Sequence, residues 1–314
     1  MTKKLIVVCG PTASGKTRLG IELCKALGGE VVSADSMQVY RGMDIGTAKP
    51  TPAEREGVPH HMLDVAEPWE AYSVARYVEE ATACVEDILA RGRRPVVVGG
   101  TGLYIDALIR GRQFAGVGSG GGHREALEQL LQEQGIGPLL EELRRVDPEA
   151  AGRLHPRDTK RIIRALEVYR ETGMTISHHN RESSRLPPRY EAAFIGLGFA
   201  DRAALKMRID QRVDQMMKQG LLEEVQGLLA REIPRGCTAM QAIGYKEIAA
   251  CLERGAPPEE AAEEVKLRSR QYAKRQLSWF RRDPSIHWHL WEKTPDFTIA
   301  LQDSIQFLRE KGLE

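Results

Sequence analysis

The chain has 314 residues, of which 42% are hydrophobic and 28% charged, a composition typical of a globular protein with room for two domains. Its net charge of +1 excludes binding to a polyanion through an overall positive field, so any nucleic-acid contact has to come from local basic patches. The cysteines are scattered without a C-x-x-C pair, which argues against a disulfide framework and a thiolate zinc site. No apolar stretch reaches the roughly 18 residues of a membrane span, so we expect a cytoplasmic protein with no membrane partner.

Short apolar runs rich in β-branched residues alternate with helical patterns from the start of the chain. Strands are predicted at residues 5–10, 30–35, 60–65 and 95–100. Helices are predicted between them, at residues 16–27 and 72–91. Later in the chain, residues 193–199 predict a further strand and residues 286–291 an edge strand. This alternation predicts an α/β fold with a doubly wound parallel sheet flanked by helices, as in P-loop NTPases.

A long segment of different character interrupts this alternation. Residues 116–122 read GVGSGGG and predict a flexible junction. Hydrophobic residues then recur at helical spacing until RLPPR at residues 185–189. We therefore predict an inserted all-helical domain at residues 114–192. The catalytic core would comprise residues 1–113 and 193–314 and would include C-terminal helices rich in basic residues.

The stretch GPTASGKT lies between the first predicted strand and the first predicted helix. It matches G-x-x-x-x-G-K-[ST], a loop whose backbone N–H groups hold phosphate oxygens at the start of a helix. Lys16 should reach the outer phosphates, and the Thr17 hydroxyl should ligate Mg²⁺, which we expect as the cofactor. The predicted phosphate site consists of Gly10, Pro11, Thr12, Ala13, Ser14, Gly15, Lys16 and Thr17. The pattern indicates a pyrophosphate with a metal and does not specify a nucleoside.

The acidic residue expected beside such a loop occurs at an unusual strand end. Nucleotide-hydrolysing proteins usually place a metal-supporting Asp after a later apolar strand. Here the run at 95–100 ends in two glycines followed by Thr101, and the acid is Asp35, after the run at 30–35. Because the carboxyl ends of parallel strands line one crevice, Asp35, Thr101 and the phosphate loop should converge. Asp35 would either hold Mg²⁺ through water or accept a proton from an incoming nucleophile.

Several segments carry a specific likeness to a known family. They are GPTASGKT (10–17), DSMQVYRGMDIGTAKPT (35–51), GVPHHMLD (57–64), YSVARY (72–77), GGTGLY (99–104), HPRDTKRIIRALEVY (155–169), AIGYKE (242–247) and YAKRQLSWFRR (272–282). Together, over nearly the whole chain, they resemble the bacterial tRNA dimethylallyltransferases. The resemblance implies that the loop holds dimethylallyl diphosphate. It further implies transfer of the dimethylallyl group to N6 of adenosine 37 in the tRNA anticodon loop, with release of diphosphate.

The resemblance also implies roles for individual residues, with Asp35, Thr101 and Lys16 as the catalytic set. Asp35 would be the general base for N6, and Thr101 would contact the bridging oxygen of the diphosphate. The adenine pocket would be lined by Ser36, Met37 and Gln38. Asp35 and Thr101 would contact the tRNA as well. Either Arg208 or Arg212, one helical turn apart, would neutralise the leaving group.

Basic residues gather in two regions that we assign to the tRNA. In the inserted domain, Arg124 matches an RNA-contacting arginine of the family. The helix that follows Asp158 would supply Thr159, Lys160, Arg161, Ile162, Ile163 and Arg164. The segment 266–282 holds seven Lys or Arg residues and no acid, interleaved with aromatic residues. Basic groups bind phosphates and aromatic rings stack on bases, so we assign further contacts to Lys274, Arg275, Arg281 and Arg282.

Three other functions remain open from the residues alone. A small-molecule kinase would use the same loop with ATP as donor, but it lacks the expected Asp after residue 100. An adenylate isopentenyltransferase would prenylate a free nucleotide, for which the inserted basic domain has no use. A non-catalytic RNA-binding switch would leave Lys16, Asp35 and Thr101 unexplained. The favoured prediction is an RNA-modifying prenyltransferase that acts as a monomer on the anticodon stem-loop.

Overall fold

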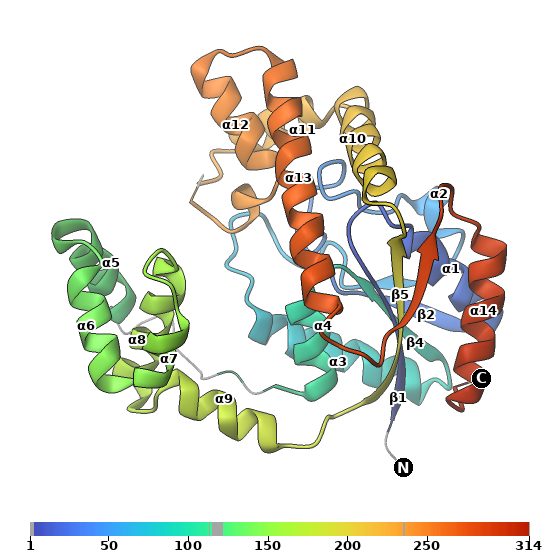
Figure 1. The fold of residues 1–314 in the computed structure, drawn as a ribbon. Helices are drawn as coiled ribbons and strands as arrows, with labels where there is room; N and C mark the ends of the chain where they lie inside the picture. Colours follow the sequence, from blue (N-terminus) through green and yellow to red (C-terminus); the bar gives the residue numbers. More distant parts are fainter. Residues whose placement is uncertain (1–2, 113, 115–121, 235, 314) are drawn as a thin grey trace. The chain divides into compact units, whose positions relative to one another are not determined.

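A computed structural model describes residues 3–112, 114, 122–234 and 236–313. The chain divides into two compact units, one formed by Met1–Gly111 with Arg189–Glu314 and the other by Arg112–Pro188 (Figure 1). The second unit ends before the predicted boundary at 192, because Tyr190 already bonds to the first unit by donating its hydroxyl to Glu86 (2.8 Å). Of the glycine-rich stretch 116–122, only Gly122 lies within the described residues.

The first unit is built on a six-stranded sheet in the order β3-β2-β4-β1-β5-β6, in which every neighbouring pair is parallel. Its strands are β1 (Lys4–Cys9), β2 (Gly29–Ser33), β3 (His60–His61), β4 (Arg94–Gly99), β5 (Glu191–Phe199) and β6 (His287–Trp291). The predicted parallel sheet and its edge strand are confirmed. Strand β3 is shorter than predicted because Met62 and Asp64 adopt positive φ angles of 64° and 56°, which end the extended conformation.

Helices cover both faces of this sheet. The helices of the first unit are α1 (Lys16–Leu27), α2 (Pro52–Arg55), α3 (Val74–Ala90), α4 (Gly102–Arg110), α10 (Arg202–Lys218), α11 (Leu221–Ala230), the 3₁₀ turn η1 (Ala239–Gln241), α12 (Tyr245–Arg254), α13 (Pro258–Phe280) and α14 (Phe297–Glu310). Figure 1 shows α1 and α14 on one side of the sheet, and α3 and α4 on the other. It also shows α10 to α13 gathered beyond the carboxyl ends of the strands. This arrangement leaves the carboxyl edge of the sheet between a phosphate loop and a group of helices.

Strand β1 lies inside the sheet and explains why its sequence is a continuous apolar run. Leu5, Val7 and Val8 have no exposed surface, because helices pack on both faces of the strand. The β-branched residues Val96, Val97 and Ile195 fill the neighbouring strands in the same way. A strand that is apolar and buried from Leu5 to Cys9 therefore leads directly into the loop that begins at Gly10.

The second unit, within its described residues, consists of helices packed around a core of their own. These are α5 (His123–Gln134), α6 (Gly137–Val146), α7 (Pro148–Arg153), α8 (Thr159–Thr172) and α9 (Ile176–Arg185). Leu127, Leu139 and Leu143 pack against Ile162 and Leu166 in this core. Helix α7 begins where Asp147 accepts a hydrogen bond from the amide of Ala150 (3.0 Å), a helix cap of the usual kind.

The adjacent histidines of β3 serve the fold. The Nδ1 atom of His60 is bonded to the carbonyl of Val58 (2.8 Å), and Nε2 of His61 to the carboxylate of Glu30 (2.7 Å). Glu30 is almost buried on β2 and also pairs with Arg91. The hydrogen bond from Arg91 lowers the pKa of Glu30 to about 2, and that from His61 adds to this effect. The His61 side chain therefore fastens β3 to β2, and the His60 side chain bonds within its own segment.

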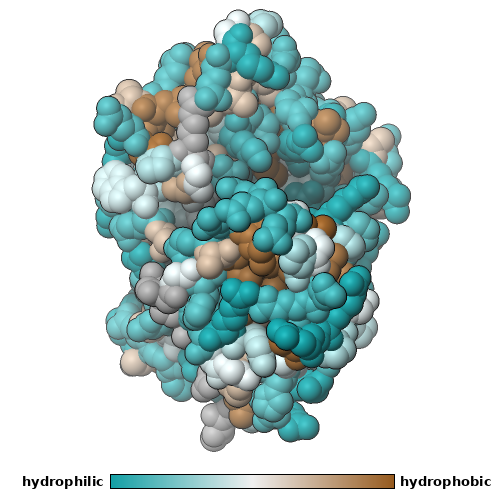
Figure 2. Space-filling model, turned by 90° about the vertical axis from the view of Figure 1, so that its left-hand side faces the viewer, coloured by the Kyte–Doolittle hydropathy of each residue, from teal (hydrophilic) through white to brown (hydrophobic). Residues whose placement is uncertain are grey.

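The surface and the helices of the described residues bear on whether a helix could span a membrane. On the face drawn in Figure 2, hydrophilic residues predominate and hydrophobic residues form separate areas. Among the helices of the described ranges, none combines the length and the apolarity that crossing a bilayer requires.

Candidate active site

Loops from three neighbouring strands meet at the carboxyl edge of the sheet. The phosphate loop follows β1, the segment that contains Asp35 follows β2, and Thr101 follows β4 (Figure 1). Because β2, β4 and β1 are adjacent and parallel, their carboxyl ends are brought together there. The predicted catalytic residues of all three segments therefore share one site.

The phosphate loop depends on backbone conformations that glycine favours. Gly10 and Gly15 have φ angles of 139° and 94°, and Ala13 has a φ angle of 62°. A Cβ atom on Gly10 would lie 2.2 Å from the carbonyl oxygen of Leu197, so no other residue fits there. Helix α1 starts at Lys16, and the first amides of a helix have no acceptor within it. The loop thus presents unpaired N–H groups and the positive end of a helix dipole to an anion.

Two cationic side chains lie close to this loop. Burial, and to a smaller extent the positive charge of Arg212, lower the pKa of Lys16 to about 8. Burial also lowers the pKa of Arg212, while the negative charge of Asp35 acts in the opposite direction on both groups. Without a bound anion, the positive charges of Lys16 and Arg212 repel each other beside the phosphate loop, where burial limits their solvation. The site is therefore preorganised for a multiply charged anion such as diphosphate.

Arg208 and Arg212, which sequence left as equal candidates, differ in their surroundings. The Nε atom of Arg208 donates to the carbonyl oxygen of Ala13 (3.3 Å), and its guanidinium lies 5.7 Å from the centre of the Phe199 ring. Arg208 is thus bonded to the backbone of the phosphate loop. In contrast, the charge of Arg212 lowers the pKa of Lys16, and the charge of Asp35 raises the pKa of Arg212.

Asp35 is held by its own loop through one oxygen. Its Oδ1 atom accepts hydrogen bonds from the amides of Met37 (2.9 Å) and Gln38 (3.3 Å). Its Oδ2 atom has no hydrogen-bond donor in the described part of the chain. Because the bound oxygen fixes the orientation of the carboxylate, the second oxygen is positioned to accept a proton from a ligand.

Thr101 connects the segments after β2 and β4. Its hydroxyl accepts a hydrogen bond from the amide of Ser36 (3.1 Å), and its own amide donates to the carbonyl of Ala34 (3.2 Å). A Cβ atom on Gly99 would lie 2.1 Å from the Ala34 carbonyl oxygen, which explains a glycine at the end of β4. Burial raises the pKa of Tyr272 to about 12, and the charge of Asp35 adds to the effect, so α13 reaches this site too.

The predicted adenine-pocket residues fall into two groups. Ser36 and Met37 are half-buried beside Asp35. The side chain of Gln38 is committed within the loop, because its Nε2 atom donates to the carbonyls of Thr47 (3.2 Å) and Ala48 (3.3 Å). Its Oε1 atom accepts from the Ser33 hydroxyl (3.1 Å). Gln38 therefore maintains the shape of the pocket in this structure.

A buried lysine and a distant glutamate, both missed from the sequence, hold the loop that follows Asp35. The Nζ atom of Lys49 donates to the carbonyl of Tyr40 (2.8 Å) and to the carboxylates of Asp44 and Asp64 (2.6 Å each). The carboxylate of Glu224 accepts hydrogen bonds from the successive amides of residues 44–46 (2.9–3.1 Å). The only sequence signal was that GTAKP lies within a recognised segment, which gives no role for the lysine.

The recognised segment AIGYKE supports the same loop. The Tyr245 hydroxyl donates to Glu224, and burial raises the pKa of Tyr245 well above its usual range. A Cβ atom on Gly46 would lie 2.4 Å from the Tyr245 ring, so the two segments are in close contact. The amide of Gly244 is bonded to Glu247 at the start of α12 (2.8 Å). This part of AIGYKE therefore positions the loop that carries Asp35 and Met37.

Elements from the C-terminal part of the chain support the phosphate loop from behind. The indole Nε1 of Trp291 donates to the carbonyl of Ser14 (2.9 Å). The Phe297 ring lies against Gly15, where a Cβ atom would approach it to 2.7 Å. Gln276 on α13 bonds to the amide of Thr12 (2.8 Å). None of these contacts was predicted, because single aromatic and amide residues have no sequence signature.

The predicted tRNA contact residues on α8 differ in their exposure. Ile162 and Ile163 are 0% and 3% exposed and belong to the core of the helical unit, and their assignment to the tRNA stays a prediction. Lys160 and Arg161 are exposed, and Thr159 is half-buried. A cavity of about 390 Å³ lies in this unit, lined by Arg153, Leu154, Lys160, Arg161, Arg164, Ala165 and Ile176. Arg124 forms ion pairs with Glu128 (3.1 Å) and Glu167 (3.4 Å).

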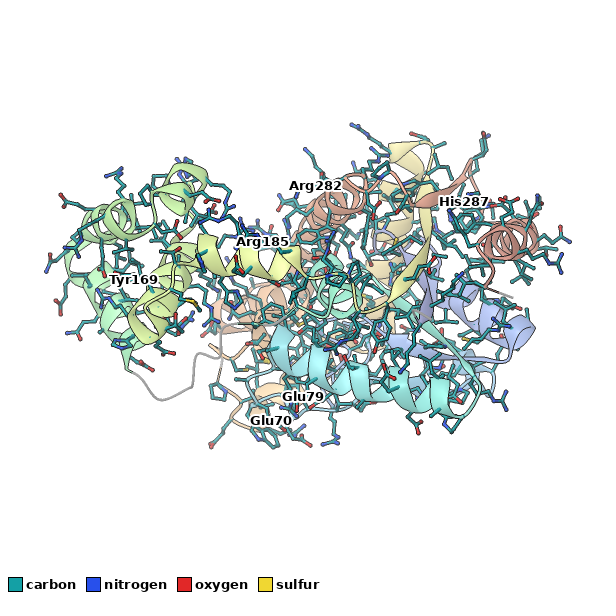
Figure 3. The ribbon with its side chains drawn as sticks, turned by 90° about the horizontal axis from the view of Figure 1, so that it is seen from below. Glu70, Glu79, Tyr169, Arg185, Arg282 and His287 are labelled. Carbon is teal, nitrogen blue, oxygen red and sulfur yellow. The ribbon has the colours of Figure 1, made fainter. Side chains whose placement is uncertain are left out.

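The basic segment 266–282 separates into two halves. In the first half, Lys266 pairs with Asp214 (2.7 Å), Arg268 with Glu264 (2.7 Å), and Arg270 with Asp210. In the second half, four cations have no carboxylate within salt-bridge distance among the described residues: Lys274, Arg275, Arg281 and Arg282. Arg282 follows the carboxyl end of α13 (Figure 3). Phe280 is buried, whereas Trp279 is 41% exposed and packs beside Gly102 next to the site.

The fold and the site define a phosphate-loop protein. Its anion-binding site has two cationic side chains and one carboxylate, and no acidic residue directly follows β4. Residues 38–283 match the family described as IPP transferase, and residues 3–67 match the one described as isopentenyl transferase. The chain belongs to the IPP transferase family.

Similar proteins with assigned activities span the whole chain. It is 49% identical to a tRNA dimethylallyltransferase of Geobacillus thermodenitrificans, over 99% of this chain and 98% of the relative. The crystal structure of a tRNA isopentenylpyrophosphate transferase from Bacillus halodurans matches with a TM-score of 0.72 and 41% identity, covering 99% of this chain and 98% of that one. A eukaryotic dimethylallyltransferase acting on tRNA matches with a TM-score of 0.84 and 31% identity, covering 98% of this chain and 80% of that one.

The pKa of Lys16 gives the site a defined pH dependence. Lys16 with a pKa of about 8 loses its charge as the pH rises past 8, whereas a bound anion keeps it protonated by raising that pKa. We expect the affinity for magnesium diphosphate to fall above pH 8, approaching tenfold per pH unit, when measured by isothermal titration calorimetry. The Lys16→Met variant should bind more weakly and lack this component, since ionisation of the ligand affects both proteins equally. Parallel pH profiles for the two proteins would show that the charge of Lys16 does not contribute to diphosphate binding.

Proposed function

We propose that this chain transfers the dimethylallyl group of dimethylallyl diphosphate to N6 of adenosine 37 in the anticodon loop of tRNA. One observation carries the proposal. The cations Lys16 and Arg212 repel each other beside a phosphate loop, and the negative charge of Asp35 acts on both. The Asp35 carboxylate has one oxygen without a hydrogen bond in the described part of the chain. The whole-length similarity to tRNA dimethylallyltransferases supports the same reaction.

The donor half of the site would hold the diphosphate. When the allylic C–O bond breaks, the bonding electrons move to the diphosphate, and the leaving group gains negative charge. Lys16, Arg212 and the amides at the start of α1 would stabilise that charge in a fixed geometry. We propose Arg212, and not Arg208, as the arginine that contacts the leaving group. Thr101 would contact the bridging oxygen through its hydroxyl.

The acceptor half would hold the adenine beside Asp35. As the new C–N bond forms, the exocyclic nitrogen becomes positively charged and must lose a proton. The free Oδ2 atom of Asp35 would take that proton, while Met37 and Ser36 would contact the base. Because an allylic carbocation also reacts with water, the half-buried surroundings of Asp35 favour transfer over hydrolysis.

The residues are compatible with a Mg²⁺ ion that enters with the diphosphate. Among the described residues, no group of three or more His, Cys, Asp or Glu side chains is arranged to hold a metal. Magnesium commonly uses few protein ligands and completes its shell with substrate oxygens and water. The Thr17 hydroxyl at the start of α1 forms no hydrogen bond in the described part of the chain and would provide such a ligand. The ion would add positive charge beside the leaving diphosphate.

Contacts with tRNA would come from two basic surfaces. The unpaired cations Lys274, Arg275, Arg281 and Arg282 would bind phosphates, and the exposed face of Trp279 offers a place for a base to stack. In the helical unit, the exposed residues Lys160 and Arg161 at the rim of the cavity would do the same. A flipped-out base is the usual way for an enzyme to reach an atom inside a stacked loop.

The other functions have less support. A kinase that uses ATP normally has a metal-supporting Asp near the end of a later strand, and here Gly99 ends β4 and is followed by Gly100 and Thr101. An adenylate prenyltransferase has no need for the helical unit with its exposed Lys160 and Arg161. The relatives that cover the whole chain are enzymes that act on tRNA.

A transfer assay tests the reaction together with the role of Asp35. The protein is incubated with Mg²⁺, labelled dimethylallyl diphosphate and unmodified tRNA, and the digested nucleosides are analysed for N6-prenylated adenosine. We expect this product from the unaltered protein. Asp35→Asn should slow single-turnover transfer by roughly 10²–10⁴, the range typical of a lost general base, while tRNA affinity changes little.

A matched control separates the base from a general charge effect. Glu79 is an exposed carboxylate on α3 (Figure 3) with no ion pair in the described part of the chain. Glu79→Gln should transfer at the unaltered rate. If Asp35→Asn transfers as fast as Glu79→Gln, then Asp35 is not the base.

The salt dependence of tRNA binding tests the C-terminal basic surface. Replacing Arg281 and Arg282 with alanine should weaken binding and reduce the slope of log K against log [salt] by about 1–2, because each lost phosphate contact removes roughly 0.7–0.9. The matched control replaces Arg254 and Arg268, two cations that pair with Glu260 and Glu264. An equal slope change in both double variants would show that Arg281 and Arg282 make no specific phosphate contact.

A further inference from the structure

Helices α10 and α13 are joined by two ion pairs that the proposed reaction does not use. Asp210 on α10 pairs with Arg270 on α13 (2.5 Å), and Asp214 pairs with Lys266 (2.7 Å). The residue numbers rise by four along α10 and fall by four along α13, so the two helices are antiparallel and the pairs lie about one helical turn apart. We call these four residues the ion-pair ladder.

The cations of the ion-pair ladder are largely withdrawn from solvent. The side chain of Lys266 is 14% exposed and that of Arg270 is 26% exposed. The hydrogen bond to Asp214 raises the pKa of Lys266, and a second one to Glu263 adds to this effect, so Lys266 is charged. Because salt screens partly buried pairs less than pairs on an open surface, these contacts persist at ordinary ionic strength. Both cations are therefore used between the helices.

The ion-pair ladder lies on the side of α10 opposite to the arginines at the phosphate loop. Each residue of a helix is rotated by about 100° from the one before, so Arg212 points about 200° away from both Asp210 and Asp214. Arg208, one turn before Arg212, bonds to the carbonyl oxygen of Ala13 (3.3 Å), which places this side of the helix at the loop. Helix α10 is therefore attached to α13 on one side and to the phosphate loop on the other.

The position of Arg212 depends on the placement of its helix. Its side chain forms no hydrogen bond or ion pair in the described part of the chain, and its charge opposes that of Lys16. This repulsion favours any shift of α10 that takes Arg212 away from the loop. The ion-pair ladder opposes such a shift, because rotating or sliding α10 on α13 would leave partly buried charges without partners.

Helix α13 provides the reference for this attachment. The side chain of Gln276 accepts a hydrogen bond from the amide of Thr12 in the phosphate loop (2.8 Å) and donates one to the carbonyl of Gly100 (3.0 Å). The phosphate loop, α13, the ion-pair ladder and α10 thus form a closed ring of contacts. Within this ring, the ladder carries the fixed position of α13 over to the helix that bears Arg212.

We propose that the four residues of the ion-pair ladder are positioning residues that hold Arg212 at the leaving diphosphate. The proposal rests on the proposed function, in which Arg212 contacts the leaving group. It also gives two cations of the basic segment 266–282 a role other than tRNA binding, since Lys266 and Arg270 act inside the protein.

Binding of magnesium diphosphate tests the proposal without an allyl group or tRNA. Asp210→Arg places like charges opposite each other and should weaken binding at least about fivefold in isothermal titration calorimetry at neutral pH, because Arg212 moves away from the anion. A direct effect of the added positive charge would instead tighten binding of the anion. Exchanging the charges, with Asp210→Arg and Arg270→Asp together, should restore the affinity to within about twofold of the unaltered protein.

Two further comparisons separate the positioning of Arg212 from general maintenance of the fold. In an Arg212→Met background, adding Asp210→Arg should cause no further loss of affinity, because the ion-pair ladder acts through Arg212. Arg270→Asp alone should weaken binding as Asp210→Arg does. Its matched control, Arg268→Asp, makes the same charge change at a residue that pairs with Glu264 within α13, and should leave the affinity unchanged.

Three results would overturn the proposal: unchanged or tighter binding in Asp210→Arg, failure of the charge exchange to restore affinity, or an undiminished loss in the Arg212→Met background. The last would mean that the ladder only maintains the helix packing. If Asp210→Arg does not fold, the neutral variant Lys266→Met with Arg270→Met should still weaken binding at least about threefold, and an unchanged affinity counts against the proposal. A failed transfer assay would leave these affinities intact, so the two proposals fail separately.

Discussion

The repulsion between Lys16 and Arg212 beside one phosphate loop is the constraint on which the rest of the site depends. Both cations have pKa values lowered first by burial, and the nearby charge of Asp35 compensates only part of the cost. A bound diphosphate relieves that cost, and a departing diphosphate with extra charge relieves it more. Binding and leaving-group stabilisation thus have the same electrostatic origin.

Keeping such a site in place requires support from distant parts of the chain. The phosphate loop is bonded by Gln276 and Trp291, and the loop after Asp35 is bonded by Glu224. These contacts span more than 170 residues, as in the 178–180 that separate Glu224 from the amides it accepts. The C-terminal helices therefore complete the catalytic site, and a shortened sheet domain would lack the groups that fix both loops.

The sequence predicted what depends on local pattern. The strands were predictable because β1 and β4 are buried on both faces and hence continuously apolar, and GPTASGKT was predictable because its backbone needs glycine at Gly10 and Gly15. The roles of Gln276 and Lys49 were not predictable, since they come only from long-range contacts. The burial of Ile162 and Ile163 was not predicted, because neighbours of basic residues on a helix can face its core. Choosing between Arg208 and Arg212 as the arginine near the leaving group required the contacts and neighbouring charges that the structure shows for each.

The most direct test is a crystal structure with a non-reactive thio analogue of dimethylallyl diphosphate, Mg²⁺ and an anticodon stem-loop. It should show the diphosphate on residues 10–17 in contact with Lys16 and Arg212, and the adenine N6 within hydrogen-bond distance of the Oδ2 atom of Asp35. An Asp35 carboxylate turned away from N6, or the diphosphate bound away from Lys16 and Arg212, would contradict the account.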